Sequence, residues 1–309
     1  MSINDLQPAI AAVGMDIAAA PLSVFDSSRG FSLTEAQIAS FFAEGFVVVD
    51  NLADAAEIAK IREIYDQLFS EHCGWNAGDF FDMAGPDDLE QGLSLPQMFW
   101  PSHYAPALAR TALYRNASVA ARQLLGPAAR RVFEHAILKP AARGAETPWH
   151  QDDAFNQTGS GYSESISVWM PLQDVTPLNG CLYYVPGSHR GPLFPHRSPG
   201  NDPRIHGLET SPPADARAIA APVPAGGAVI HHSRTLHRAG SNFSEQPRRA
   251  CTLGFAIKSW RGGLRRDYDW NLAKQTGRQA RQLEAAALPK RLLLRMLRLA
   301  RRHGLYPLI

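Results

Sequence analysis

Residues 164–175 have the sequence ESISVWMPLQDV, and their alternating pattern indicates the fold class. Two sets of side chains alternate along them: Ile166, Val168 and Met170, and Ser165, Ser167 and Trp169. Because successive side chains of a β-strand point to opposite faces, the first set can pack on a core while the second can line a cavity. We therefore expect a strand with one apolar face and one mixed face.

Five further runs of β-branched and aromatic residues lie on either side of this strand, separated by Pro, Gly and Asn. They cover residues 130–140, 181–189, 217–223, 226–233 and 249–260. Many short strands with such turns are typical of an all-β sandwich or barrel. Residues 190–216 are rich in Pro and Gly and show no periodicity, so we expect a long loop at the mouth of the barrel.

The first hundred residues show mostly helical patterns. Apolar residues recur at helical spacing in residues 33–46, where Thr34 can cap a helix, and again in residues 53–69. The run GFVVVDN at residues 45–51 predicts a short buried strand between them. We expect a mainly β fold with flanking helices, divided into an N-terminal segment (1–30), one β domain with an N-terminal helical layer (31–260) and a basic helical tail (261–309).

The composition is that of an ordinary globular protein: 309 residues, 45% hydrophobic and 19% charged. The formal net charge of +2 gives no reason to expect a nucleic-acid partner. Cys73, Cys181 and Cys251 have no paired spacing, which argues against a disulfide framework and favours a cytoplasmic location. No stretch reaches the roughly 18 apolar residues of a membrane span, and no basic leader precedes an apolar run, so we expect no transmembrane segment and no export.

The basic tail has the pattern of an amphipathic helix. Arginines and apolar residues recur at helical spacing on two faces, namely Arg291, Arg295, Arg298 and Arg302 beside Leu292, Met296 and Leu299. Such a helix can pack its apolar stripe on the domain or on a partner subunit of a homo-oligomer. Contact with a membrane surface or another acidic partner is the alternative.

The segment TPWHQDDAF, residues 147–155, places a histidine and two carboxylates close together. If a strand begins here, His150 and Asp152 point to one face and Gln151 turns outward. The two side chains could then share a metal ion with a histidine from HHSRTLHRAGSN, residues 231–242. Two histidines and one carboxylate leave coordination positions open, which suits iron(II) that must bind a bidentate acid and dioxygen together.

Four segments in this order resemble the phytanoyl-CoA dioxygenase family of iron(II)- and 2-oxoglutarate-dependent oxygenases. They are LTEAQIASFFAEGFVVVDN, WHQDDAF, VWMPLQDVTPLNGCLYYVPGSHRG and AGGAVIHHSRTLHRAGSNFSEQPRRACTLGFA. The resemblance extends from about residue 33 to residue 258. It implies a double-stranded β-helix, the jelly roll of cupin-like proteins, with helices packed outside.

The resemblance implies that His150, Asp152 and His237 are the iron ligands. Arg248, eleven residues after His237, matches the arginine that binds the distal carboxylate of 2-oxoglutarate. A guanidinium suits this task because it offers a carboxylate two parallel hydrogen bonds. Arg249 would point to the opposite face of the strand.

Other candidates follow from the same resemblance. We expect Thr147, Trp169 and Ser188 near the cosubstrate. Ala239 stands where several relatives have serine, which removes one possible hydrogen bond to 2-oxoglutarate. We expect Asp153 to cap a turn or to face solvent.

Two histidines and a lysine can each be interpreted in more than one way. We expect His231 and His232 to be packed or hydrogen-bonded residues of the preceding strand, because that is the usual fate of a histidine without a ligand. Lys139 either points inward, toward substrate, or is solvated at the end of its strand.

Residues 79–106 are expected to shape the substrate pocket. Aromatic and apolar side chains concentrate there, namely Phe80, Phe81, Met98, Phe99, Trp100, His103 and Tyr104. Within this apolar wall, Gln97 is a candidate for a polar contact with the substrate, and Phe99 is a candidate for an aromatic contact with it. Packing of the helical layer on the barrel is the alternative role for each aromatic residue.

The function expected from this resemblance is an Fe(II)- and 2-oxoglutarate-dependent dioxygenase. It would use O2 to hydroxylate an unactivated C–H bond of a small organic substrate, such as a secondary metabolite or a lipid-like or carrier-bound acyl compound, and release succinate and CO2. Desaturation, epoxidation and cyclisation remain open, whereas Asp152 disfavours halogenation because halogenating relatives have a small residue there. The fold could also belong to a non-catalytic jelly-roll protein or to a cupin-type enzyme with another metal, but neither of these needs Arg248.

Overall fold

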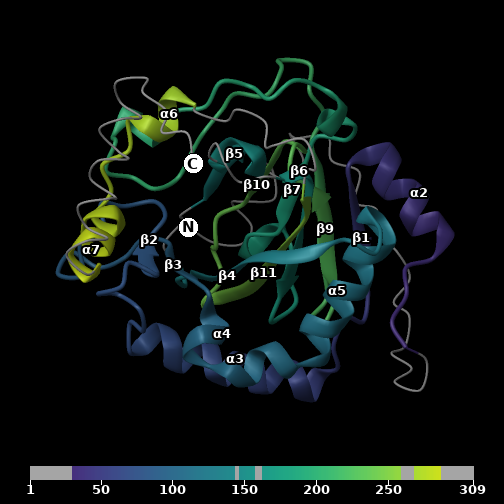
Figure 1. The fold of residues 1–309 in the computed structure, drawn as a ribbon, viewed down its shortest axis with the longest axis horizontal. Helices are drawn as coiled ribbons and strands as arrows, with labels where there is room; N and C mark the ends of the chain where they lie inside the picture. Colours follow the sequence, from purple (N-terminus) through teal and green to yellow (C-terminus); the bar gives the residue numbers. More distant parts are fainter. Residues whose placement is uncertain (1–29, 143–145, 157–161, 259–267, 287–309) are drawn as a thin grey trace.

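The computed structural model describes residues 30–142, 146–156, 162–258 and 268–286, and these form two antiparallel sheets with helices on the outside (Figure 1). The larger sheet has the strand order β1 (Phe46–Val49), β9 (Ala228–His232), β6 (Tyr162–Pro171), β11 (Arg248–Lys258), β4 (Arg130–Lys139), β3 (Pro96–Phe99) and β2 (Phe80–Asp82). The smaller sheet has the order β5 (Thr147–His150), β10 (His237–Ala239), β7 (Leu182–Tyr184) and β8 (Ile219–Ala221). The predicted mainly β class with flanking helices is confirmed.

The alternation in residues 164–175 has the predicted consequence. Val168 and Met170 of β6 belong to the core beneath the helices, whereas Ser167 and Trp169 line a cavity on the opposite face. Each of the five further predicted runs also contains a strand. The direction of the side chains along each strand therefore separates core from cavity, as the pattern indicated.

The first hundred residues are less helical than predicted. β2 and β3 extend the larger sheet beyond β4, with Met98 opposite Ala136 and Phe99 opposite His135. Phe80 and Met98 are fully buried in the core that the helices cover. Their segments are too short to show a period, and edge pairing with β4 decides their conformation.

Helices cover the outer face of the larger sheet. They are α2 (Glu35–Glu44), α3 (Ala55–Ser70), α4 (Pro101–Tyr104) and α5 (Ala112–Leu125). Two later helices, α6 (Asp269–Leu272) and α7 (Gly277–Ala285), lie beside the cavity instead. Short 3₁₀ turns occupy Pro106–Arg110, Asp152–Phe155, Pro177–Asn179, Ser188–Arg190 and Pro199–Asn201. Thr34 caps α2 through the backbone N–H of Gln37, as predicted, and Gly45 ends it at φ 83°, where a glycine avoids strain.

Two separate hydrophobic clusters stabilise this arrangement. One lies between the helices and the larger sheet, with α3 contributing Ile58, Ile61 and Tyr65. The other fills one end of the space between the two sheets, where Tyr184 of β7 and Val229 of β9 pack together. The rest of that space is a cavity lined from both sheets.

Loops add to the lining of the cavity. The predicted long loop 190–216 contributes Pro199, His206 and Leu208 to the lining. The segment from α6 to α7 also contacts the β domain, since Lys274 Nζ donates to three backbone carbonyls at positions 205–207. The basic helix predicted near residues 291–302 lies outside the described residues.

The described part of the chain has neither a disulfide bond nor a membrane-spanning helix. Cys73, Cys181 and Cys251 are all free, as the sequence predicted. None of the described helices combines the length and the apolar character that crossing a membrane requires.

Candidate active site

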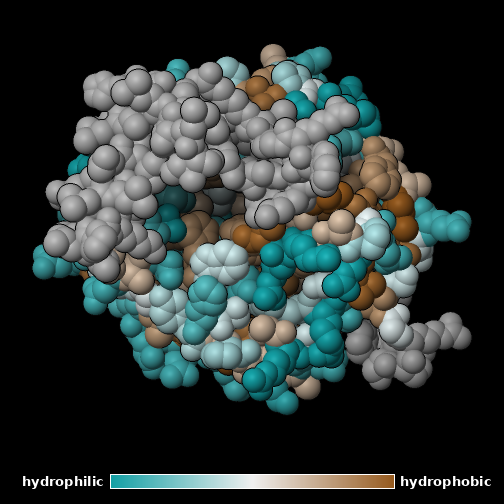
Figure 2. All heavy atoms as spheres, in the orientation of Figure 1, coloured by the Kyte–Doolittle hydropathy of each residue, from teal (hydrophilic) through white to brown (hydrophobic). Residues whose placement is uncertain are grey.

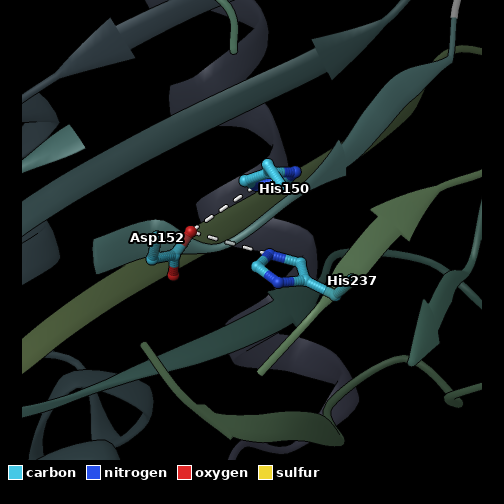
Figure 3. Close-up of side chains that lie close together, drawn as sticks. All are labelled: His150, Asp152 and His237. Carbon is cyan, nitrogen blue, oxygen red and sulfur yellow. Dashed lines mark ion pairs between the residues drawn. The ribbon is translucent and has the colours of Figure 1, made fainter. Parts of the chain in front are cut away.

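Three predicted side chains meet at one end of the cavity (Figure 3). His150 is the last residue of β5, Asp152 begins a 3₁₀ turn, and His237 begins β10. Asp152 Oδ1 lies 3.5 Å from His150 Nε2 and 3.6 Å from His237 Nε2. All three ligand atoms lie within 4.8 Å of one another, so a single metal ion could contact all of them.

The two histidines meet because their strands pair. His237 is the register partner of His150 in the antiparallel β5–β10 ladder, and their ring centroids are 4.1 Å apart. Residues directly opposite in such a ladder have side chains on the same face. Pairing between segments 87 positions apart, which the sequence does not specify, therefore creates the site.

Asp152 reaches the site by a route that differs from the prediction. β5 ends at His150, and Asp152 points toward the histidines from the 3₁₀ turn instead of from the same strand. Gln151 does not turn outward to solvent: it is fully buried. Its side chain donates to Pro192 O and Arg234 O and accepts from the backbone N–H of Phe194, which ties the loop around residues 192–194 to the site.

Backbone carbonyls orient both imidazoles. His150 Nδ1 lies 2.8 Å from Pro148 O, and His237 Nδ1 lies 2.9 Å from Thr235 O. Each Nδ1 can donate to a carbonyl only as N–H, which leaves each Nε2 as a free lone pair facing Asp152. Metal-binding histidines commonly have this arrangement. Burial, together with the neighbouring His150 and His231, lowers the pKa of His237 and so favours its neutral, ligating form.

A hydrogen-bonded chain holds the other oxygen of Asp152. Ser167 Oγ donates to Oδ2 at 2.6 Å, and His231 Nε2 lies 3.1 Å from the same oxygen. His231 Nδ1 in turn lies 2.9 Å from the hydroxyl of Tyr184. Because an ionised carboxylate only accepts, His231 donates through Nε2 and accepts the Tyr184 hydroxyl at Nδ1.

This environment keeps Asp152 ionised. Burial alone would raise its pKa, but the surrounding imidazoles of His237, His150 and His231 hold the pKa well below its usual range. His231 is thus hydrogen-bonded in the preceding strand, as predicted, and His232 pairs with Glu164. Asp153 accepts from the amide of Asn156 in the turn and is buried, so its solvent-facing alternative is wrong.

Arg248 lines the cavity and is only 1% exposed. Its guanidinium carbon lies 5.3 Å from the centre of the Trp169 ring, while its Nε and Nη1 atoms have no hydrogen-bond partner within the described part of the chain. Burial lowers the pKa of Arg248 to about 9, which still leaves it charged at neutral pH. Arg249 points to the other face of β11 and pairs with Asp66, as strand alternation predicted.

The cavity has a volume of about 690 Å³, which is the size of a small-molecule site. The face of the molecule that Figure 2 shows is hollowed near its centre. Apolar side chains from both sheets and the loops make up much of the wall: Met83, Leu95, Phe99, Phe133, Ile137, Phe155, Leu182, Leu208 and Phe255. The metal-ligand candidates and Arg248 face this one space.

Four more of the predicted site residues also face the cavity: Thr147, Trp169, Gln97 and Phe99. Ser188 does not line it, because its hydroxyl donates to Val185 O and accepts from the backbone N–H of Leu236 in the turn before β10. The family resemblance located this turn but not the direction of its side chain.

Lys139 lies neither in solvent nor at the cavity. It is buried, so its solvated alternative is wrong, yet it does not line the cavity. Its Nζ donates to Gly240 O at 2.7 Å, and the register of β4 and β11 places it opposite Arg248. Of the aromatic segment 79–106, Phe99 lines the cavity, whereas Phe80 and Met98 pack in the core and Tyr104 is exposed.

The sequence interpretation missed several residues that line the cavity. Thr252 of β11 and His135 of β4 are register partners, and both face the cavity. The alternation of side chains along either strand could have suggested this orientation. Lys274 and Arg278 line it from the segment after residue 260. The Thr276–Gln279 capping box signals a helix start there, but no local pattern indicates where that helix docks.

A model of the phytanoyl-CoA dioxygenase (PhyH) family matches residues 41–250. This chain belongs to the phytanoyl-CoA dioxygenase family. The chain is accordingly a 2-oxoglutarate-dependent dioxygenase, an oxidoreductase with iron as its metal, as predicted. The family assignment favours this enzyme class over a non-catalytic jelly-roll protein and over a cupin-type enzyme with a different metal.

Named relatives of this dioxygenase differ in their substrates. It is 26% identical to a probable alpha-ketoglutarate-dependent hypophosphite dioxygenase of Stutzerimonas stutzeri, over 70% of this chain and 76% of the relative. It is also 26% identical to the phytanoyl-CoA dioxygenase of Arabidopsis thaliana, over 72% of this chain and 88% of the relative.

Among solved structures, EvdO2 from Micromonospora carbonacea var. aurantiaca in complex with 2-oxoglutarate is similar to this dioxygenase. The two share 34% sequence identity with a TM-score of 0.63, over 77% of this chain and 98% of EvdO2. This likeness to an oxygenase confirms the predicted jelly-roll core.

Proposed function

We propose that His150, Asp152 and His237 bind Fe(II) and that Arg248 binds the distal carboxylate of 2-oxoglutarate in the same cavity. The donor set fits the metal, because two neutral imidazoles and one carboxylate suit Fe(II) and leave positions open for further ligands. Both imidazoles are held by backbone carbonyls, and the carboxylate is held by Ser167 and His231. Such support preorganises a metal site and tunes its ligands.

The single observation that carries the proposal is that Nε and Nη1 of the buried Arg248 have no hydrogen-bond partner among the described residues. A buried charge without a counter-ion costs several kcal/mol in folding free energy, so proteins retain one where a ligand completes it. A carboxylate can satisfy Nε and one Nη through two parallel hydrogen bonds. Because the metal-ligand candidates line the same cavity, a dicarboxylate could reach both the iron and Arg248.

The chain's own residues position the reactants. The indole of Trp169 supports the guanidinium from one side, and Thr147 lies near the first histidine at the start of β5. The largely apolar wall lowers the local dielectric constant, which strengthens the interaction between Arg248 and an anion. When bound, the iron would supply activation of O2, with 2-oxoglutarate converted to succinate and CO2.

The reaction that we propose is hydroxylation of an unactivated C–H bond in a small organic substrate. Desaturation, epoxidation and cyclisation require the same metal site and the same cosubstrate, so they remain alternatives within the one chemistry. Halogenation is disfavoured because the carboxylate of Asp152 occupies the position that a halide ligand would need. The substrates that name the relatives, hypophosphite and phytanoyl-CoA, differ too much for either to be transferred to this chain.

Anaerobic titration with Fe(II) and 2-oxoglutarate tests the metal site and the cosubstrate together. We expect the weak visible metal-to-ligand charge-transfer band that chelation of 2-oxoglutarate produces, and loss of the band in His237→Ala. Wild-type protein without the band, despite stoichiometric Fe(II) binding, would contradict the proposal. Succinate release coupled to loss of one compound from a metabolite panel, with product masses increased by one oxygen, would then distinguish hydroxylation from desaturation.

A further inference from the structure

A second arginine, Arg278, also faces the cavity. Arg278 lies near the N-terminal end of α7, which contacts β2 at the side of the molecule where β2 and β3 also lie (Figure 1). Its guanidinium carbon is 4.6 Å from the centre of the Phe99 ring and 5.5 Å from that of Phe81. Its Nε is buried and makes no hydrogen bond to any residue that the structure describes.

Nearby carboxylates do not satisfy this guanidinium. Asp87 accepts from the backbone N–H groups of Asp82 and Arg278 and pairs with Arg281. Asp79 accepts from the hydroxyl of Tyr104. Both carboxylates favour the charged form of Arg278, although burial lowers its pKa to about 10. Arg278 is therefore charged, stacked on aromatic rings and left with donors to spare.

The two arginines stack on residues at opposite ends of one row across the larger sheet. Phe99, His135, Thr252 and Trp169 are register partners across β3, β4, β11 and β6. Arg278 stacks at the Phe99 end of this row, and Arg248 stacks at the Trp169 end. Three strand spacings separate the ends, about 14 Å. If 2-oxoglutarate binds Arg248 at the Trp169 end of the row, Arg278 at the Phe99 end is available for a different anion.

The wall between the two arginines suits an apolar molecule with few polar groups. Phe155 and Leu208 face the cavity beside neutral groups that lack partners, namely Gln97 Oε1, His135 Nε2 and Thr252 Oγ1. Lys274 adds positive charge near Arg278, but its Nζ already donates to three backbone carbonyls. One free guanidinium matches one carboxylate, because a dianionic phosphate would bury a second charge that no further donor compensates.

We propose that Arg278 binds the carboxylate of the substrate, and that the substrate is an organic acid whose apolar body extends along the row from Phe99 toward His150, Asp152 and His237. That the bound acid is the substrate rests on the proposed oxygenase function. The acid group is then held away from the iron, and the carbon that reacts is set by the length of the apolar body. Arg278 determines specificity and takes no part in the chemistry.

Calorimetric titration of the full chain with straight-chain acids of six to twelve carbons, and with the primary amides of the same lengths, tests the inference. Each acid and its amide differ in charge but little in size. For wild-type protein with Fe(II) and 2-oxoglutarate under anaerobic conditions, we expect at least one acid to bind about 10-fold or more tightly than its amide. The same preference is expected in metal-free protein, so the result does not depend on the charge-transfer band.

Substitutions of Arg278 test whether this residue binds the acid. Arg278→Gln should bind acid and amide equally, while Arg278→Lys, which keeps the charge but loses the planar fork, should keep a reduced preference. Arg122→Gln removes an arginine from the exposed face of α5 and should keep the wild-type preference. Unchanged 2-oxoglutarate affinity in Arg278→Gln would verify that Arg248 and the metal site are intact.

Three outcomes would overturn the inference: no binding of any acid, no preference for acid over amide in wild-type protein, or a preference that survives in Arg278→Gln. None of these bears on the charge-transfer band, which tests the proposed function separately. A missing band with a preserved, Arg278-dependent acid preference would instead leave an acid-binding cavity and reject the oxygenase site.

Discussion

His231 Nε2 lies 3.1 Å from Asp152 Oδ2, so a histidine outside the candidate metal triad holds the triad's carboxylate in place. The remaining oxygen, Oδ1, is the one that faces His150 and His237. Tyr184 extends the chain of hydrogen bonds from β7, and its ring also stacks on Phe46 of β1. The orientation of one carboxylate thus depends on residues from both sheets.

Replacing this histidine should weaken the metal site without removing a ligand. We expect His231→Gln to bind Fe(II) about 10- to 100-fold more weakly than wild type, because a flexible amide does not hold its donor where the imidazole fixes the Asp152 rotamer. Competition with a metal-binding dye under anaerobic conditions measures the effect. His232→Gln, which changes the neighbouring histidine that pairs with exposed Glu164, should retain wild-type affinity. Equal losses in both variants would argue against the orienting role.

Asp152 and Asp153 are adjacent, and their replacement should have opposite consequences. Asp152→Asn removes a negative ligand and should abolish Fe(II) binding at micromolar concentrations. Asp153→Asn keeps an oxygen that can accept from Asn156, so it should bind the metal normally and lose little stability. Metal content after anaerobic loading and desalting measures both. Retention of a full equivalent of iron in Asp152→Asn would exclude this carboxylate as a ligand.

Arg248 should lower the stability of the ligand-free protein and raise its affinity for 2-oxoglutarate. Burial disfavours the charged form of Arg248, whose pKa falls below the ordinary value, so at neutral pH the folded state carries an unfavourable charge when 2-oxoglutarate is absent. We expect Arg248→Met to unfold at higher denaturant concentration than wild type, by about 1 kcal/mol or more. The same variant should bind 2-oxoglutarate at least about 10-fold more weakly.

Urea unfolding of metal-free protein, with and without 2-oxoglutarate, measures both consequences. At one concentration, the cosubstrate should stabilise wild-type protein more than Arg248→Met, because the gain in stability grows with affinity. If 2-oxoglutarate stabilises both proteins equally, its carboxylate is bound elsewhere.

Acid should destabilise the protein partly through His135. Burial lowers the pKa of His135 to about 3, with Asp152 opposing and Arg278 adding to the shift. Between about pH 6.5 and pH 3 the unfolded chain binds a proton at this histidine while the folded chain does not. Stability from this group is therefore present above about pH 6.5 and is lost as the pH falls, by up to about 1.4 kcal/mol per pH unit.

Comparing variants isolates this contribution. His135→Gln has no proton to bind, so its stability should fall less steeply between about pH 6.5 and pH 5 than that of wild type. His103→Gln, which removes an exposed histidine outside the cavity, is the matched control. Urea unfolding at each pH gives the slopes, and parallel slopes for His135→Gln and wild type would show that His135 is protonated in the folded state.

Local sequence was sufficient for the features that depend on residues close together in the chain. Strand alternation placed Val168 in the core and Trp169 on the cavity side, and it also separated Arg248 from Arg249. The family resemblance selected His237, which has no local feature that distinguishes it from His231. Periodicity and spacing can be read from the sequence alone, without knowing which residues lie close together in the fold.

Only the tertiary structure decided the features that depend on partners distant in sequence. β2 and β3 are strands because they pair at the edge beyond β4, and Gln151 is buried because carbonyls from residues 192 and 234 surround it. Ser188 binds a turn instead of the cavity, and Arg278 lines the cavity because α7 docks beside β2. Hydrogen-bond partners and burial arise when the chain closes on itself, and a linear pattern records which groups can bond but not which groups they meet.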